Sequence, residues 1–559
     1  MKKPILLFAI ISSLCFLSKI SYAQAPDWLW AKSAGGTSSD CAAYVAVDTS
    51  GNTYVVGDFT SSTITFGSTT LTNADNTGYT YDIFIVKYDA NGNLLWAKSA
   101  GGWNDDGVVS VAVDVSGNIY FAGWFQSSTI IFGFTTLTNA GHADIFLAKY
   151  DTNGNMLWAK SAGGASSDEA TSVAVDASGN TYLTGEFFSS TITFGSTILT
   201  NAGGDDIFLA KYDVNGDVIW AKSAGGTGWE DWANSVAVDS SGNTYVVGSF
   251  SSHTLSFGFN TLTNTDSIGT TSDLFLAKYD TYGNVLWAKS AGGTSDDLAN
   301  SVAVDSSGNT YLAGRFRSPT ITFGSTTLTN AGVNHADIFL AKYDANGNVL
   351  WAKSSGGTGN DWANSVAVDA SGNTYLTGVF ISPTITFGST TLTNASYNSQ
   401  DMFLAKYDTS GYVLWAKSAG GTYDDEAFSI TVDASGNIYL AGYFFSSTIT
   451  FGFTVLTNAD NTGNTSDMFL TKLSASTGIN ELSNLLNISI FPNPAIDNLT
   501  IKVPQKATIE ILNIEGQIMK SISAGENHTT IDISGFASGM YFVEVKTDEG
   551  IVVKKFVKE

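Results

Sequence analysis

The sequence is poor in cysteine, in basic side chains and in long apolar runs, and each shortage excludes a class of protein. Only two cysteines occur among 559 residues, so a disulfide framework cannot hold the fold together. The 51 acidic and 26 basic side chains give a net charge of −25, which argues against nucleic acid or anionic lipid as partners because their phosphates would be repelled. After residue 23, no stretch approaches the roughly 18 uninterrupted apolar residues of a membrane-spanning helix.

The first 23 residues have the pattern of a secretory signal peptide. Two lysines precede an apolar run over residues 5–17, and residues 21–23 form a small-x-small cleavage site. A lipoprotein anchored through Cys15 is an alternative, but Leu14 stands where such a signal has a small residue. We therefore predict an exported, soluble mature protein in which Cys41 is the only thiol.

Seven copies of one tryptophan-containing motif divide most of the chain. The motif ends in Trp-Ala-Lys-Ser, and its tryptophans are spaced 66, 62, 62, 67, 64 and 64 residues apart: Trp30, Trp96, Trp158, Trp220, Trp287, Trp351 and Trp415. The first copy lacks the front half of the unit, and the last front half, which begins at Asp467, has no tryptophan after it. This arrangement predicts a ring that the two ends of the array close together.

Within one unit, the pattern predicts four main antiparallel strands and one small hairpin. Apolar or alternating runs cover residues 172–176, 181–187, 206–212 and 218–223, with turns rich in glycine and asparagine between them. The segment 190–200 has Gly-Ser at its centre, which indicates an extra hairpin. Helical periodicity is absent. We predict an all-β protein with a seven-bladed β-propeller over residues 24–478, built from seven repeats of about 64 residues and closed by the N-terminal strand.

The order of these segments resembles the bacterial SBBP β-propeller repeat. The resembling pattern is Ser-Val-Ala-Val-Asp-x-Ser-Gly-Asn-x-Tyr-x-x-Gly-x-Phe, then Phe-Gly, then Asp-Ile-Phe-Leu-Ala-Lys-Tyr-Asp-x-x-Gly-Asn-x-x-Trp. It covers about four fifths of the chain. The resemblance implies the fold and leaves activity open, because many members of this family have no assigned biochemical function.

Composition changes after residue 478, where residues 479–487 form a predicted linker. Prolines appear, and short alternating segments at 488–494, 499–502, 507–512, 535–545 and 552–556 predict a small C-terminal β-sandwich over residues 488–559.

This C-terminal module resembles the type A sorting domain of the type IX secretion system of Bacteroidota. The resembling segments are Phe491-Pro-Asn-Pro494, Asn513-Ile-Glu-Gly516, Ser538-Gly-Met-Tyr541 and Lys554-Lys-Phe-Val-Lys558. The resemblance implies that residues 488–559 contact the type IX machinery. It also implies that the protein crosses the outer membrane and is then released or attached to the cell surface.

One aspartate per repeat precedes each predicted inner strand. In a propeller this position lies near the mouth of the central channel, so the seven carboxylates are candidates for a cation ring, with Ca²⁺ as the ion. The alternative that we favour is that each carboxylate caps backbone N–H groups of the entering loop. The seven residues are Asp40, Asp106, Asp168, Asp231, Asp297, Asp361 and Asp425.

Aromatic residues in the same connecting segments are candidates for ligand binding. The residue after each of these aspartates varies between repeats and includes Trp232 and Trp362, while Trp103, Trp229 and Tyr423 lie in the loops just before. Exposed aromatic side chains on rigid loops favour contacts with sugars or proteins. The alternative is that Trp232 and Trp362 plug the channel or pack between blades.

No catalytic constellation is visible in the sequence. The four histidines have no ligand-like spacing, and no Gly-x-Ser-x-Gly elbow with a matched histidine is present. We predict no catalytic residue and no enzyme. The favoured function is a monomeric, secreted or surface-displayed protein that binds a glycan or another protein. A passive surface or matrix component without a specific ligand is the main alternative, and an extracellular hydrolase or lyase is a third.

Overall fold

The computed structural model forms two compact units, one ending at Ala475 and one holding the described residues from 489 onward. The residues that it describes are 25–75, 78–227, 230–266, 270–332, 334–460, 462–475, 489–503, 506–513, 517–524, 527–547 and 550–559. None of these residues is helical, so the described chain offers no helix that could cross a membrane. The predicted signal peptide and linker lie outside the described residues.

The described residues of the first unit form seven four-stranded antiparallel sheets, which we number one to seven by their first strands. The first strands are β2 (Asp40–Val47), β8 (Asp106–Val113), β14 (Asp168–Val175), β20 (Asp231–Val238), β26 (Asp297–Val304), β32 (Asp361–Val368) and β38 (Asp425–Val432). The second strands are β3 (Thr53–Phe59), β9 (Ile119–Phe125), β15 (Thr181–Phe187), β21 (Thr244–Phe250), β27 (Thr310–Phe316), β33 (Thr374–Phe380) and β39 (Ile438–Phe444).

The third strands are β6 (Asp82–Tyr88), β12 (Asp144–Tyr150), β18 (Asp206–Tyr212), β24 (Asp273–Tyr279), β30 (Asp337–Tyr343), β36 (Asp401–Tyr407) and β42 (Asp467–Leu473). The fourth strands are β7 (Leu94–Ala100), β13 (Met156–Ala162), β19 (Val218–Ala224), β25 (Val285–Ala291), β31 (Val349–Ser355), β37 (Val413–Ala419) and, in sheet seven, β1 (Trp28–Ala34).

A two-stranded hairpin connects the second and third strands of every sheet. The sequence of residues 190–200 predicts this hairpin for one repeat. The hairpins are β4 (Thr63–Phe66) with β5 (Thr69–Thr72), β10 (Thr129–Phe132) with β11 (Thr135–Thr138), β16 (Thr191–Phe194) with β17 (Thr197–Thr200), β22 (Thr254–Phe257) with β23 (Asn260–Thr263), β28 (Thr320–Phe323) with β29 (Thr326–Thr329), β34 (Thr384–Phe387) with β35 (Thr390–Thr393) and β40 (Thr448–Phe451) with β41 (Thr454–Thr457).

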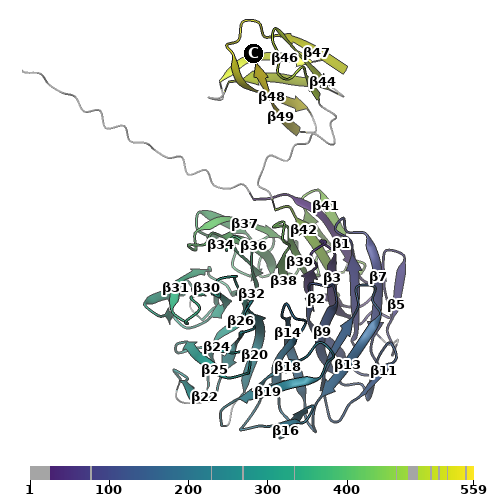
Figure 1. Cartoon of the computed structure of the whole chain (residues 1–559), viewed down its shortest axis with the longest axis vertical. Helices are drawn as coiled ribbons and strands as arrows, with labels where there is room; N and C mark the ends of the chain where they lie inside the picture. Colours follow the sequence, from purple (N-terminus) through teal and green to yellow (C-terminus); the bar gives the residue numbers. More distant parts are fainter. Residues whose placement is uncertain are drawn as a thin grey trace, which may run out of the picture. The chain divides into compact units, whose positions relative to one another are not determined.

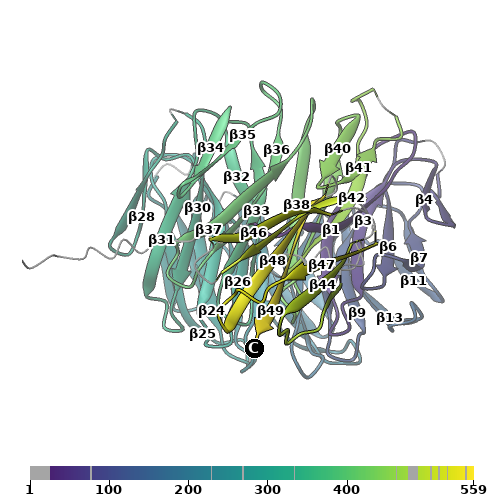
Figure 2. The same cartoon turned by 90° about the horizontal axis from the view of Figure 1, so that it is seen from above.

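The seven sheets have a propeller-like arrangement. Figure 1 shows first strands such as β14 and β26 near the middle and hairpin strands such as β5, β16 and β22 at the periphery. In the turned view of Figure 2, β4 and β28 lie at opposite edges. Each first strand contacts the first strand of the next sheet, and β38 also contacts β2.

The N-terminal strand pairs with the last sheet, as the repeat pattern predicts. In the antiparallel pairing of β1 with β42, Ala31 stands opposite Thr471 and Ser33 opposite Phe469. One apolar core joins Val55 of sheet one to Tyr439 of sheet seven. The two ends of the array therefore pack together, in the same way that the cores of successive sheets pack.

The predicted strand bounds are confirmed for the second and third strands of the unit and are too short for the first strand. We predict the first strand over residues 172–176, whereas β14 spans Asp168–Val175. The pairing with β15 shifts between Ala170 and Ser172, which marks a β-bulge. A bulge interrupts the alternation of side chains, so the residues before it do not read as part of one strand.

The second unit consists of two sheets around one core. One sheet contains β43 (Ser489–Phe491), β44 (Asn498–Val503) and β47 (Asn527–Asp532), and the other contains β46 (Ile518–Ala524), β45 (Ala507–Leu512), β48 (Gly539–Thr547) and β49 (Gly550–Lys558). Ile501 of the first sheet and Val543 of the second share this core. Strands β46 and β47 lie at sheet edges and are absent from the sequence prediction. β47 contains a single apolar residue, Ile531, and the apolar residues of β46 do not alternate regularly.

Candidate functional site

Each of the seven candidate aspartates is buried at the start of a first strand. Asp40 Oδ1 accepts the N–H of Ser61 at 3.2 Å, and Asp40 Oδ2 accepts the Ser61 hydroxyl at 2.7 Å. The other six make the same contact with the serine at the same repeat position. These contacts agree with the alternative in which each carboxylate caps backbone N–H groups. Within the described ranges, no group of three acidic, histidine or cysteine side chains is placed to hold a metal ion.

A second buried aspartate lies at the start of every third strand, close to the first strand of the next sheet. Asp82 Oδ2 accepts the N–H of Ala74 at 2.7 Å, while Asp82 Oδ1 has no hydrogen-bond partner among the described residues. Burial, and less strongly the neighbouring carboxylate of Asp106, raises the pKa of Asp82 to about 7. Burial likewise raises the pKa of Asp106 to about 6. Each junction between sheets therefore holds two carboxyl groups whose charge is disfavoured.

The bulge in each first strand leaves one residue unpaired, and these residues together line a central cavity of about 500 Å³. Cys41, Tyr44, Asp58 and Val108 complete its lining. The bulge residues are Ala43, Val109, Thr171, Asn234, Asn300, Asn364 and Phe428. We call this hollow the central cavity.

The lining of the central cavity differs from sheet to sheet. The amide Nδ2 of Asn234 donates to the carbonyl of Ala299 at 2.8 Å, and Asn300 donates to Ala363 at 2.8 Å. Asn364 continues this row of side chains that bond to the next first strand. On the other side the bulge residues are alanine, valine and phenylalanine. The cavity is thus polar on one side and apolar on the other.

A buried glutamate organises one wall of this cavity. Glu426 is 7% exposed, and its carboxylate accepts the Asn364 amide and the Tyr443 hydroxyl, each at 2.8 Å. The Trp362 side chain also donates to Glu426. Burial raises the pKa of Glu426, and these hydrogen bonds oppose the shift. Arg315, one of the two arginines of the chain, lies over the Trp362 ring with its Cζ 5.5 Å from the ring centroid.

Trp232 lies in a different, acidic setting. Its side chain donates to Asp205, and three further carboxylates lie nearby on Glu169, Glu186 and Glu230. Burial, followed by repulsion from these neighbours, raises the pKa of Glu186 to about 8. Trp232 and Trp362 are both partly buried and hydrogen-bonded to acidic side chains.

Tyr423 lines a second hollow of about 340 Å³, which we call the rim crevice. Tyr397, Asn398, Asp424 and Phe445 line it as well. Tyr397 is 91% exposed and Tyr423 is 46% exposed, so both rings are open to solvent.

Aromatic rings connect the rim crevice to the central cavity. Phe445 of the crevice packs against Tyr443 with ring centroids 5.5 Å apart. Tyr443 packs against Phe428 of the cavity at 5.3 Å. The two hollows therefore lie on either side of Tyr443.

The structure brings only some of the sequence candidates together. Trp362 reaches the wall of the central cavity through Glu426, and Tyr423 joins the rim crevice. Trp103 is 78% exposed in the loop before β8, and Trp229 lies outside the described residues.

Tyr397 and the bulge residues are not among the residues that the sequence predicts for the site. The bulge position, three residues after each buried aspartate, varies between repeats as much as the position that the analysis singled out. That variation is the signal that would have found it.

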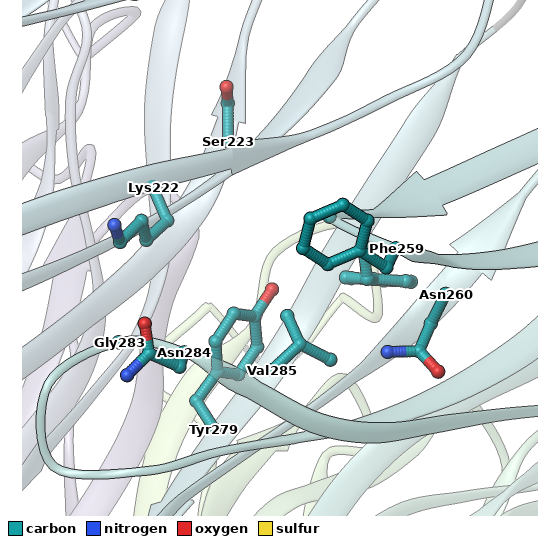
Figure 3. Close-up of a pocket in the computed structure, with 10 residues that line it drawn as sticks. Lys222, Ser223, Phe259, Asn260, Tyr279, Gly283, Asn284 and Val285 are labelled. Atoms are coloured by element: carbon teal, nitrogen blue, oxygen red, sulfur yellow. The ribbon is translucent and has the colours of Figure 1, made fainter.

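Two shallow hollows at the hairpins repeat from sheet to sheet. Figure 3 shows one of about 280 Å³, with Lys222, Phe259, Tyr279 and Asn284 among its lining. The next sheet has an equivalent hollow of about 360 Å³. Because the same repeat positions line both, they follow from the fold and do not mark a unique site.

Comparison with protein families finds one match in each unit. Residues 219–249 match the beta-propeller repeat, and residues 489–559 match the secretion system C-terminal sorting domain. The chain carries an SBBP propeller repeat and a type IX sorting domain. The sorting domain indicates export to the cell surface or the medium, with the type IX machinery as partner.

The chain is also similar to curated proteins and solved structures. It is 26% identical over 66% of its length to an uncharacterized WD repeat-containing protein of Acanthamoeba polyphaga mimivirus. It is 28% identical over 43% of its length to the regulatory protein FlaEY of Caulobacter vibrioides. The matches span only 32% and 26% of those proteins.

Among solved structures, Sqt1 of Chaetomium thermophilum is 10% identical with a TM-score of 0.38, and the match covers 81% of this chain and 99% of that one. PorZ, a surface component of the type IX secretion system of Porphyromonas gingivalis, is 12% identical with a TM-score of 0.17, and the match covers 95% of this chain and 100% of that one.

Proposed function

We propose that the first unit is a closed seven-bladed β-propeller over residues 24–478, preceded by a signal peptide over residues 1–23. The pairing of β1 with β42 and the contact between β38 and β2 support this proposal. A linker over residues 479–487 joins the propeller to the sorting domain over residues 488–559. The mature protein is a monomer that is released into the medium or held at the outer-membrane surface.

The function that this geometry supports best is glycan binding outside the cell. The observation that carries the proposal is the rim crevice, where two exposed tyrosines stand beside the amide of Asn398 and the carboxylate of Asp424. Aromatic rings cover the apolar C–H face of a sugar, while nearby amide and carboxylate groups hydrogen-bond to its hydroxyls. The two tyrosines come from different loops but line the same hollow, so a sugar bound there would contact both rings.

Binding fits the observations better than catalysis or a passive role. The buried glutamate beside the cavity, Glu426, accepts hydrogen bonds from Asn364 and Tyr443 and is not one of the residues that line the cavity, where a substrate would need to meet it. A passive matrix component would need no departure from the repeat. The combination of Trp362 in sheet six with Glu426 and Tyr443 in sheet seven is such a departure.

A glycan array tests the proposal with the mature chain, residues 24–559. We expect one class of neutral glycan to bind, and the Tyr397→Ala, Tyr423→Ala double variant to bind it about tenfold more weakly, a loss of about 1.4 kcal/mol. Tyr282→Ala is the matched control, because Tyr282 is 77% exposed in the turn between β24 and β25, at the opposite end of the strands. Absence of glycan binding, or equal losses in the variant and the control, would contradict the proposal.

A further inference from the structure

We infer that the central cavity is the subsite that receives the terminal sugar of the glycan. This inference rests on the proposed glycan-binding function and adds a second, more selective contact to the rim crevice. The cavity is asymmetric although the fold is repetitive, and each side of it matches one side of a pyranose ring.

The polar side of the cavity offers side-chain amides for hydrogen bonding. Asn234 and Asn300 each donate one of their two amide hydrogens to a carbonyl of the next first strand. Within the described residues, no hydrogen bond reaches the Oδ1 atom of Asn300. The neighbouring Thr171 hydroxyl is likewise committed as a donor, to the carbonyl of Ala233 at 2.5 Å. Each amide keeps its oxygen and a second N–H, so this side suits a ligand that both donates and accepts hydrogen bonds, as sugar hydroxyls do.

The opposite side offers apolar contact. Phe428 presents an aromatic ring, and Ala43 and Val109 are small enough to leave room beside it. The carbon-bound hydrogens on one face of a pyranose pack favourably against such a ring. A ligand that is rich in hydroxyls on one side and apolar on the other fits this cavity.

The lining of the cavity offers no cation to an acidic sugar. Asp58 lines the cavity and Glu426 lies behind Asn364, while no basic side chain is among the described lining residues. A carboxylate or sulfate on the sugar would find no basic partner among these lining residues, because Arg315, which interacts electrostatically with Glu426, is not one of them. The inferred ligand is therefore a neutral sugar at the end of a chain.

Glu426 is a positioning residue for this subsite. It holds the Asn364 amide on the polar side and the Tyr443 hydroxyl on the aromatic side through hydrogen bonds of 2.8 Å each. Since Tyr443 also packs against Phe445 of the rim crevice, the same glutamate fixes the geometry between the two hollows.

Cys41 provides a direct probe of the cavity. It lines the cavity, and it is the only cysteine beyond the predicted signal peptide. Modification of this thiol by methyl methanethiosulfonate at one fixed pH therefore reports access to the cavity. The competitors are neutral gluco-, manno- and galacto-oligosaccharides of two to four sugars, matched uronic-acid oligosaccharides, and Ca²⁺ alone.

We expect the neutral oligosaccharide that binds the mature protein to slow modification of Cys41 about tenfold at saturation, as exclusion from one site would. Ala43→Phe fills the apolar side and removes no hydrogen bond, so it is expected to weaken oligosaccharide binding about tenfold, or about 1.4 kcal/mol. Tyr397→Ala is the contrasting variant. It weakens binding at the rim, yet a saturating oligosaccharide still protects Cys41.

The outcomes separate this inference from the proposed function. If oligosaccharides bind but leave the Cys41 rate unchanged, and Ala43→Phe binds like the wild type, the subsite is wrong and glycan binding stands. If no glycan binds, both the proposed function and the inferred subsite are wrong. Protection by Ca²⁺ alone, or equal protection by uronic-acid chains, would also overturn the inference. The Cys41 measurement on the wild type remains decisive even if Ala43→Phe fails to fold.

Discussion

The backbone N–H of Val45 donates to Ser429 Oγ at 3.2 Å, across 384 residues of sequence. The same bond joins Val173 to Ser110 between neighbouring sheets, at 3.1 Å. The first and last sheets are thus connected by the contact that successive sheets use. That contact lies on the first strands, whereas the N-terminal strand β1 forms the outer edge of sheet seven and adds Ala34 to the core between sheets seven and one.

Removing residues 24–36 should destabilise the first unit and cause self-association. The deletion removes β1 and leaves the edge of β42 without a partner, and an open edge strand pairs readily with other chains. It also removes Ala34 from the core between sheets one and seven. We expect a lower melting temperature by circular dichroism and oligomers by light scattering. A monomeric variant with unchanged melting would contradict closure by the N-terminal strand.

The buried aspartates at the sheet junctions should make the protein more stable in mild acid than at alkaline pH. Burial raises the pKa of Asp40 and of Asp82 from 3.8 to about 7. A carboxyl group whose folded-state pKa is raised stabilises the fold fully below its unfolded pKa, and this stability is lost as pH rises through the folded pKa. The free energy of unfolding should therefore fall between about pH 4 and pH 7 as the pH increases.

Melting temperatures from pH 4 to pH 8 test this expectation. Asp82→Asn removes one titrating group and resembles the protonated acid, so it should reduce the slope. The control is Asp89→Asn, because hydrogen bonds from Asn93 lower the pKa of Asp89 in an exposed turn. A melting temperature that rises steadily from pH 4 to pH 8 would contradict the prediction.

Calcium should raise the melting temperature only slightly. Both carboxylate oxygens of Asp361 already accept hydrogen bonds from Ser382, at 3.1 and 2.6 Å, and no bound ion is needed to satisfy them. We expect a small shift in millimolar Ca²⁺ by differential scanning calorimetry. A rise of tens of degrees that disappears in the Asp231→Asn, Asp361→Asn double variant would show a cation ring instead.

Two replacements of Glu426 should distinguish the effect of its charge on stability from the effect of its hydrogen bonds. Glu426→Leu leaves the Tyr443 hydroxyl and the Trp362 indole without their acceptor, at a cost of about 1–3 kcal/mol for each unsatisfied buried group. Glu426→Gln keeps one acceptor oxygen and should cost less. Urea unfolding followed by tryptophan fluorescence measures both. Equal stability of the two variants would show that the hydrogen bonds do not hold this wall.

Deleting residues 488–559 should stop export in the periplasm. The deletion removes the sorting domain and leaves the predicted signal peptide, and a signal peptide directs transfer across the inner membrane only. The described residues of the first unit form a separate compact unit, so we expect it to remain folded. Fractionation of a host with a type IX system measures this, with the full chain as control. Truncated protein that reaches the surface as efficiently as the full chain would show that the C-terminal domain is not the export signal.

The sequence predicts local structure well where side chains alternate without interruption. Strands β15 and β18 have the predicted bounds, and the extra hairpin forms at Gly195, whose φ of 58° suits a tight turn. The sorting domain follows from its own motifs. Strand β14 is longer than predicted because of its bulge. The bulge depends on pairing with β15, which sequence alternation does not reveal.

The repeat spacing, the four-strand unit and the C-terminal module are therefore determined by the sequence alone, because each depends on neighbours within a few residues. The candidate site is decided by tertiary structure. Asn364 and Glu426 are 62 residues apart in the chain and meet only because their first strands lie side by side. Tyr397 and Tyr423 likewise belong to separate loops that converge at the rim crevice. Contacts between different repeats cannot be predicted from the residue pattern within one repeat. Only the packing of the sheets brings these side chains together.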